Sequence, residues 1–200
     1  VYRTAQAAPL LFGITGTNGK TSVSYLLHGM LAQLGLVAGL STTAERKIGE
    51  LTVASSLTTP EATEVHGLLA RMRESEVRAV VLEVSAQALT RNRVDGLVFD
   101  VVGFLNLSHD HLDDYADMET YFAAKLPLFE PDRARRGVVS LDTEWGQRVV
   151  DASRIPITTV SSTPGVDAAW TVTILEERAE YTEFELTPPE GQSITTRVPV

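Results

Sequence analysis

The residues best suited to chemistry form a run of ten, GITGTNGKTS, at positions 13–22. An apolar stretch at 9–12 precedes this run, and apolar residues at helical spacing follow it over 23–34. A buried strand, a glycine-rich turn and a helix that opens with Lys20 and Thr21 point backbone N–H groups and a helix N terminus at one place. Such a place suits an anion, and a phosphate above all.

The run departs from the usual phosphate-loop pattern at one position. The pattern G-x-x-x-x-G-K-[ST] requires a glycine five residues before Gly19, where this sequence has Ile14, and the glycine is displaced by one residue to Gly13. The flanking strand and helix patterns still favour a nucleoside triphosphate site over an ordinary tight turn. Lys20 would then contact the outer phosphates, and the Thr21 hydroxyl would hold Mg²⁺.

Composition limits the partners of the chain. Its 200 residues carry a formal net charge of -9, which argues against binding to nucleic acid or an anionic membrane surface. The sequence has no cysteine, so it can form neither disulfides nor a thiolate metal site. No apolar run approaches the roughly 20 residues of a membrane span, and we expect a cytoplasmic, monomeric protein without a signal peptide.

Alternating strand and helix patterns predict an α/β fold, a three-layer domain of the phosphate-loop type with a mostly parallel sheet. Further buried strands are expected at 77–84, 98–105, 137–141 and 157–160. Beyond Pro164, alternation of apolar and polar residues predicts a small antiparallel β appendage at about 166–200. We interpret the chain as a piece of a longer protein in which residues 1–9 are a linker.

Two short polar segments lie next to the expected strands. Thr58-Thr59-Pro60-Glu61 resembles a helix start, in which the threonines serve as caps. Glu83 ends a buried strand, where open parallel sheets place their ligands, so it is a candidate for Mg²⁺ binding, either directly or through another ligand. The alternative is a solvated glutamate at a strand end. Arg91 and Arg93 follow and could grip phosphate or carboxylate, although loop arginines are commonly solvated.

A polar cluster at 106–114 directly follows the strand expected at 98–105. Its two histidines, His109 and His111, are separated by one residue, but no cysteine or third histidine lies near enough to indicate zinc. A Mg²⁺ site with oxygen ligands, one histidine and water is more consistent with the phosphate loop.

Lys125 interrupts the apolar face of a helix expected at about 118–129. Such a lysine can extend to solvent along its aliphatic stem. If it is instead buried at the site, desolvation lowers the pKa of a lysine and gives access to the neutral amine. A neutral amine reacts with carbon dioxide to give a carbamate, which is an anionic metal ligand. Pro127 is expected to kink or end the helix one turn later.

Together, five ordered motifs resemble the central ATPase domain of the Mur ligases, and the MurE type above all. The resemblance covers about residues 10–160, and it explains the displaced glycine because the loop of that family reads G-x-T-G-T-N-G-K-T. The motifs are Gly13–Thr21, Thr58–Glu61, Leu82–Ser85, Asn106–Asp113 and Ala123–Lys125.

The resemblance implies a central ATP-binding domain at 10–200, with an N-terminal and a C-terminal domain outside this chain. It also implies ATP and Mg²⁺ as cofactors, and a UDP-MurNAc-dipeptide and an amino acid as substrates. Lys20, His111 and a carbamylated Lys125 would be catalytic. The ATP-binding residues would be Gly16, Thr17, Asn18, Gly19, Lys20, Thr21 and Ser22. The metal ligands would be Thr21, Glu83, His111 and Lys125. The substrate-binding residues would be Thr58, Thr59, Ser85, Arg91 and Arg93.

The sequence departs from this family at several substrate positions. Ala86 and Gln87 stand where the family usually has serine and histidine, and Arg91 stands where glutamine is frequent. Asp114-Tyr115 replaces the frequent Tyr-His. The implied reaction is transfer of the terminal phosphoryl group of ATP to a substrate carboxylate, followed by attack of an amine on the acyl phosphate. Alternatives are a folylpolyglutamate synthase-like or other Mur-type ligase, a phosphate-loop small-molecule kinase, and a non-catalytic nucleotide-binding module.

Overall fold

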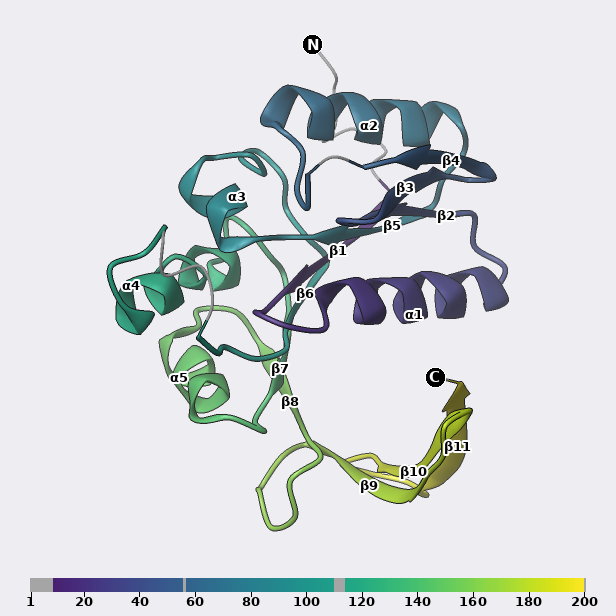
Figure 1. The fold of residues 1–200 in the computed structure, drawn as a ribbon, viewed down its shortest axis with the longest axis vertical. Helices are drawn as coiled ribbons and strands as arrows, with labels where there is room; N and C mark the ends of the chain where they lie inside the picture. Colours follow the sequence, from purple (N-terminus) through teal and green to yellow (C-terminus); the bar gives the residue numbers. More distant parts are fainter. Residues whose placement is uncertain (1–8, 56, 110–113, 200) are drawn as a thin grey trace.

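The computed structural model describes residues 9–55, 57–109 and 114–199, which form layers around one continuous sheet (Figure 1). The strands of the described chain are β1 Leu10–Thr15, β2 Ala38–Ser41, β3 Glu45–Ile48, β4 Leu51–Ala54, β5 Ala79–Glu83, β6 Val101–Phe104, β7 Gly137–Ser140, β8 Ile157–Ser161, β9 Trp170–Glu177, β10 Tyr181–Thr187 and β11 Ile194–Pro199. The helices are α1 Lys20–Gln33, α2 Ala62–Glu74, α3 Ala86–Thr90, α4 Met118–Ala123, the 3₁₀ helix η1 Leu126–Phe129 and α5 Glu144–Ala152.

The strand order is β11-β10-β9-β8-β7-β6-β1-β5-β2-β3-β4. The strands from β8 to β2 in this order are all parallel, which confirms the predicted α/β fold. β1 lies between β5 and β6, so the segments that follow these three strands meet at one edge of the sheet. Helices cover both faces, as Figure 1 shows with α1 on one side and α2 on the other.

Each face of the sheet has its own apolar cluster. The smaller cluster joins α1 to the centre of the sheet and includes Ile14, Leu31 and Val81. The larger cluster packs α2, α4 and α5 against the opposite face and includes Met72, Phe99 and Phe122. Strands that are buried on both faces must be apolar throughout, which is why β1 and β5 read as continuous hydrophobic runs.

The apolar residues of the predicted first helix are only partly buried in the structure. Val23, Leu27 and Leu31 pack toward the sheet, as the spacing predicts. Met30 and Leu34, which belong to the same predicted face, are 55% and 77% exposed. The row of side chains in contact with β1, β2 and β5 is narrower than the apolar stripe, so the rest of the stripe faces outward.

The helix predicted at 118–129 ends early. Asp117 caps α4, and the hydrogen bond from the Thr120 amide holds the pKa of the Asp117 carboxyl below its usual value. The α-helix stops at Ala123, and the chain continues as the 3₁₀ helix η1. Pro127 lacks an amide hydrogen, and its ring would clash with the carbonyl of Ala123 in a continuous helix.

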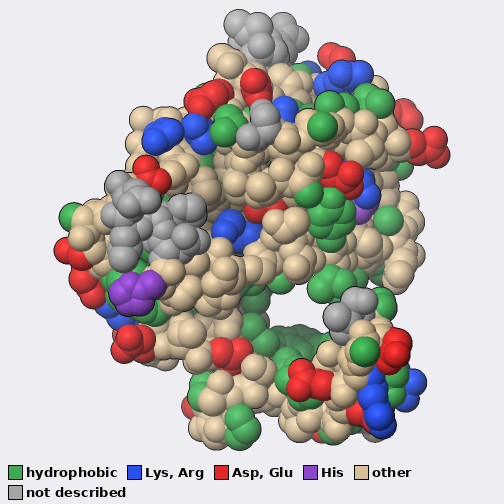
Figure 2. Space-filling model, in the orientation of Figure 1, with side chains coloured by type: hydrophobic (Ala, Val, Ile, Leu, Met, Phe, Trp, Pro, Cys, Tyr) green, Lys and Arg blue, Asp and Glu red, His purple; other side chains and the backbone are tan. Residues whose placement is uncertain are grey.

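The C-terminal strands form the predicted antiparallel appendage. β9 joins the parallel strand β8 through a short ladder, in which Val160 lies opposite Trp170 and Ser161 opposite Thr171. β10 and β11 then add antiparallel strands at the edge. Figure 2 shows an opening between these C-terminal strands and the part of the molecule in which helices cover the sheet. Within the described residues, no helix has the length and apolar character that a membrane span requires.

Candidate active site

The phosphate loop connects β1 to α1 and leaves the first turn of α1 open to an anion. Gly19 is the N-cap residue, and its left-handed φ of 81° is one that glycine adopts without strain. No side chain caps this helix, and its first turn holds no acidic residue. The amide groups at the start of a helix lack partners inside the helix, and the first turn of α1 itself carries no carboxylate that would repel a phosphate.

The displaced glycine belongs to the strand rather than to the loop. Gly13 lies inside β1, and a Cβ atom at this position would lie 3.0 Å from the ring of Phe99. Phe99 is fully buried, so its ring has little room to move away. Gly13 therefore permits close packing beneath the loop.

Asn106, at the end of the β6 segment, holds the loop in shape. Its Oδ1 accepts from the amides of Thr17 at 3.2 Å and Asn18 at 2.9 Å, and its Nδ2 donates to the Asn18 carbonyl at 3.2 Å. The Ser108 amide donates to Thr17 Oγ1 at 3.0 Å. Thus the amides of Thr17 and Asn18 serve the loop itself, and the helical ladder begins with the Val23 amide, which bonds the Gly19 carbonyl. The amides at 20–22 therefore remain for a phosphate.

Two lysines that lie far apart in the sequence both contact the phosphate loop. Lys20 Nζ donates to the carbonyls of Gly16 at 3.1 Å and Thr17 at 2.8 Å. Lys125 Nζ donates to the same Gly16 carbonyl at 3.3 Å and lies 4.4 Å from the centre of the Tyr121 ring. Lys125 is 1% exposed, so its side chain does not reach solvent along its stem. The early end of α4 places this residue at the turn into η1, facing the loop.

Glu83 brings a buried carboxylate to the same edge. It is 1% exposed, and the parallel register sets it opposite Ile14 near the end of β1. Thr21 Oγ1 donates to its Oε1 at 2.8 Å, while Thr43 donates through its amide at 3.1 Å and its hydroxyl at 3.2 Å. A carboxylate beside a hydroxyl is an oxygen set of the kind that Mg²⁺ prefers, so Glu83 and Thr21 fit the predicted ion.

Thr43 is a residue that sequence reasoning missed. It lies in the turn between β2 and β3, within a segment that the pattern marked only as polar and irregular. Its hydroxyl also lies 3.0 Å from that of Thr58. The position of Thr43 after a parallel strand next to β5 was the one available signal.

The predicted substrate residues have different environments. Thr59 is buried, and its hydroxyl donates to the Glu83 carbonyl at 2.8 Å and accepts from the Ser85 amide at 3.1 Å. The threonines do not cap α2, because this helix begins at Ala62 with Glu61 as its N-cap. Ser85 caps α3 by accepting from the Ala88 amide. These contacts fix the segment beside Glu83, and the substrate role of both residues stays a prediction.

Arg91 and Arg93 differ in burial and in their hydrogen bonds. Arg91 is exposed, whereas Arg93 is 6% exposed and donates to the Thr59 carbonyl at 3.2 Å and to the Glu61 carboxylate at 2.5 Å. Thus Arg93 supports the Thr59 segment. His111 lies outside the described residues, and no group of three or more histidine, cysteine, aspartate or glutamate side chains gathers within the described ranges.

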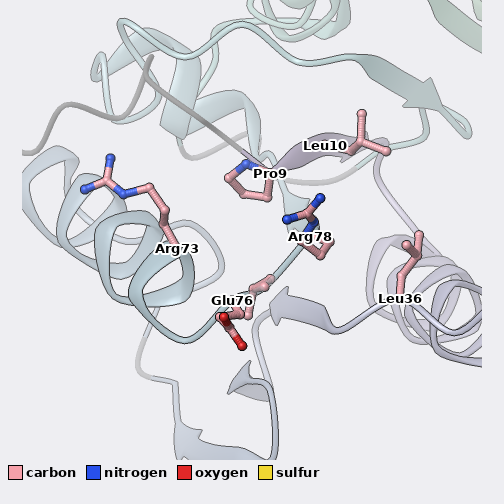
Figure 3. Close-up of a pocket in the computed structure, with 7 residues that line it drawn as sticks. Pro9, Leu10, Leu36, Arg73, Glu76 and Arg78 are labelled. Carbon is pink, nitrogen blue, oxygen red and sulfur yellow. The ribbon is translucent and has the colours of Figure 1, made fainter.

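A small cavity of about 60 Å³ lies between the phosphate loop and the predicted substrate segment. It is lined by Gly16, Lys20, Thr58, Ser85, Ala86, Gln87, Tyr115, Tyr121 and Lys125. A larger cavity of about 560 Å³ lies at the opposite edge of the sheet, where Leu10, Val77 and Arg78 precede or begin their strands (Figure 3). The small cavity, and not the large one, adjoins the groups suited to chemistry.

Comparisons with known proteins place the chain in one family. The family described as "Mur ligase middle domain" matches residues 14–200. A UDP-N-acetylmuramyl-tripeptide synthetase from Leifsonia xyli subsp. xyli is 64% identical over 200 residues, which cover 100% of this chain and 39% of that protein. A UDP-N-acetylmuramoyl-L-alanyl-D-glutamate–2,6-diaminopimelate ligase from Streptomyces avermitilis is 44% identical over 191 residues, which cover 96% of this chain and 38% of that protein.

Solved structures share the fold at lower identity. A structure of a UDP-N-acetylmuramoyl-L-alanyl-D-glutamate–2,6-diaminopimelate ligase superposes with a TM-score of 0.84 at 24% identity, covering 96% of this chain and 40% of that one. E. coli FolC in complex with DHPP and ADP superposes with a TM-score of 0.67 at 19% identity, covering 96% and 49%. The chain thus spans about two fifths of the length of the curated relatives quoted above. The match over 14–200 and the identity to these relatives establish that the chain belongs to the Mur ligase family, as its middle domain.

Proposed function

We propose that the protein containing this chain is an ATP-dependent, ADP-forming ligase of peptidoglycan precursor synthesis. It would add the third amino acid to UDP-MurNAc-L-Ala-D-Glu through an acyl phosphate, in the cytoplasm. The observation that carries the proposal is the buried Lys125, whose Nζ lies 3.3 Å from the Gly16 carbonyl inside the phosphate loop. A small-molecule kinase would have no use for a carbamylated lysine at this point, whereas the resemblance implies that a ligase of this family uses Lys125 in that form.

The predicted site residues would have distinct tasks in the proposed reaction. The first-turn amides of α1 and the Lys20 ammonium would bind the phosphates of ATP and stabilise charge on the transferred phosphoryl group. Thr21, Glu83 and the carbamate of Lys125 would hold Mg²⁺, with His111 as a further ligand, and the bound ion would supply additional positive charge at the phosphates. Thr43 and Thr59 would keep Glu83 in position. Thr58, Ser85, Arg91 and Arg93 would line or support the path of the substrate.

The names of the relatives support the substrate class, since one is a tripeptide synthetase and another a diaminopimelate ligase. The test is a ligation assay on the full-length protein with ATP, UDP-MurNAc-L-Ala-D-Glu and a panel that includes lysine and diaminopimelate. We expect ADP and a tripeptide product in equal amounts with one amino acid of the panel. A stable phosphorylated product formed without any amine would instead favour the kinase.

Two variants sharpen this assay. Lys125→Ala is expected to abolish ligation, and added short carboxylates should restore part of it by replacing the carbamate. Full activity of Lys125→Ala would rule out the role of Lys125 as a metal ligand. The isolated 200-residue chain is expected to bind ATP weakly and to form no tripeptide, and product from this chain alone would contradict that expectation.

A further inference from the structure

One residue that lines the cavity beside the phosphate loop, Tyr115, has a buried hydroxyl that the proposed reaction does not use. Tyr115 is 7% exposed and lines this cavity. Its hydroxyl is buried and has no hydrogen-bond partner among the described residues. A buried hydroxyl without a partner is costly, and such groups in native proteins commonly serve a ligand or an ordered water.

Tyr115 is held in place from two sides. Its ring packs on that of Tyr121, with the ring centres 5.1 Å apart and the planes tilted by 34°. The preceding residue, Asp114, accepts a hydrogen bond from the side-chain amide of Gln87 on α3. A fixed ring gives its hydroxyl a fixed direction, as a positioning group requires.

The same cavity holds the amine that a carbamate would modify. Lys125 lines it, is 1% exposed, and packs over the Tyr121 ring on which Tyr115 also packs. The cavity has a volume of about 60 Å³, which leaves room for small groups. A carbamate adds three heavy atoms to the amine.

We infer that Tyr115 is a positioning residue for a carbamate on Lys125, and that its hydroxyl donates a hydrogen bond to one carbamate oxygen. The inference rests on the carbamate in the proposed function. In the step concerned, the Nζ lone pair forms a bond to the carbon of CO₂ as one C=O π pair moves to oxygen, and the nitrogen releases a proton to solvent. The product carries a single negative charge on two oxygens, and a phenol O–H can donate a hydrogen bond to one of them.

This assignment gives a meaning to two departures from the family pattern. Gln87 and Asp114-Tyr115 replace residues that the family frequently has at these positions. Gln87 and Tyr115 line the cavity. The side-chain amide of Gln87 donates to the carboxylate of Asp114, and Asp114 directly precedes Tyr115. The replacements therefore form one connected unit rather than separate substitutions.

The test measures carbamate formation directly in the full-length protein. With ¹³C-bicarbonate in the buffer, the carbamate carbon gives an NMR signal, which is assigned by its loss in Lys125→Met. Tyr115→Phe keeps the ring and removes the hydroxyl, and we expect it to need about tenfold more bicarbonate for half occupancy, the loss of one hydrogen bond to a charged group. Tyr181→Phe is the matched control, because the Tyr181 hydroxyl bonds Glu176 on the antiparallel strands, and it should leave the midpoint unchanged.

Thermal unfolding in bicarbonate-free buffer provides the second measurement. Tyr115→Phe should melt no lower than the wild type there, because the hydroxyl has no partner to lose, and a lower melting temperature would overturn the inference. An unchanged bicarbonate midpoint would also overturn it while leaving the ligase proposal intact. If the wild type ligates but shows no carbamate, both the carbamate and the role of Tyr115 fall. If Tyr115→Phe raises the bicarbonate midpoint but no amino acid is ligated, the role of Tyr115 stands and only the proposed ligase reaction is refuted.

Discussion

Replacing Arg93 by methionine tests whether this side chain supports the structure of the site or serves only a substrate. The guanidinium is buried and donates to the Thr59 carbonyl and to Glu61. Thr59 in turn donates to the carbonyl of Glu83, so Arg93 supports the segment that fixes the buried carboxylate. A residue that only bound substrate could be replaced without any change in the stability of the free protein.

The magnitude follows from the contacts that methionine cannot make. A hydrogen bond from a charged group to the Thr59 carbonyl is worth about 1.5–3 kcal/mol. The ion pair with Glu61, whose side chain is 56% exposed, adds about 0.5 kcal/mol. Methionine also removes the buried Nε, which has no partner among the described residues, and this change stabilises the variant by about 1 kcal/mol. The net loss of about 2 kcal/mol corresponds to a fall in melting temperature of about 4–8 °C for a domain of this size.

Thermal unfolding followed by circular dichroism measures this effect, with two controls from the same chain. Arg91→Met makes the same chemical change at an exposed position and should shift the melting temperature by no more than about 1 °C. Glu61→Gln removes only the ion pair and should cost about 0.5 kcal/mol. Equal melting temperatures for Arg93→Met and Arg91→Met would refute the supporting role of Arg93.

Three further changes test other parts of the fold. Thr43→Val should lower the affinity for Mg²⁺-ATP in a calorimetric titration, with recovery in Thr43→Ser, because only the serine restores the hydroxyl that bonds Glu83; equal affinities would contradict that contact. Gly13→Ala should destabilise the chain by about 1–3 kcal/mol in urea, because the added methyl meets the buried ring of Phe99; a more stable variant would show that the ring can move. Burial opposes ionisation of Asp142, but hydrogen bonds from the serine and threonine residues at 161–163 outweigh it and hold the pKa of Asp142 below its usual value. A lowered pKa stabilises the fold above the unfolded pKa, so Asp142→Asn should lower the melting temperature at pH 7 and differ less from the wild type as the pH falls below about 4; a difference that stays constant with pH would contradict this.

The sequence by itself determined the order and type of the elements around the phosphate loop. Continuous apolar runs identified β1 and β5 because a strand buried on both faces needs apolar residues throughout. The loop was also readable, since a glycine that needs positive φ and the following Lys-Thr pair are local features of the chain. Glu83 could be predicted as a site residue because an acid at the end of a buried strand is costly without a task.

Only the tertiary structure decided which side chains meet. The early end of α4 depends on Pro127 and places Lys125 inside the site, where the helical pattern left open an extended, solvated side chain. Asn106 reaches Asn18 across 88 residues of sequence because β6 lies beside β1 in the sheet. The unpartnered hydroxyl of Tyr115 likewise becomes evident only when the chain is folded. Local patterns record how a segment buries its own surface, whereas contacts between segments follow from strand order, and that order is a property of the whole sheet.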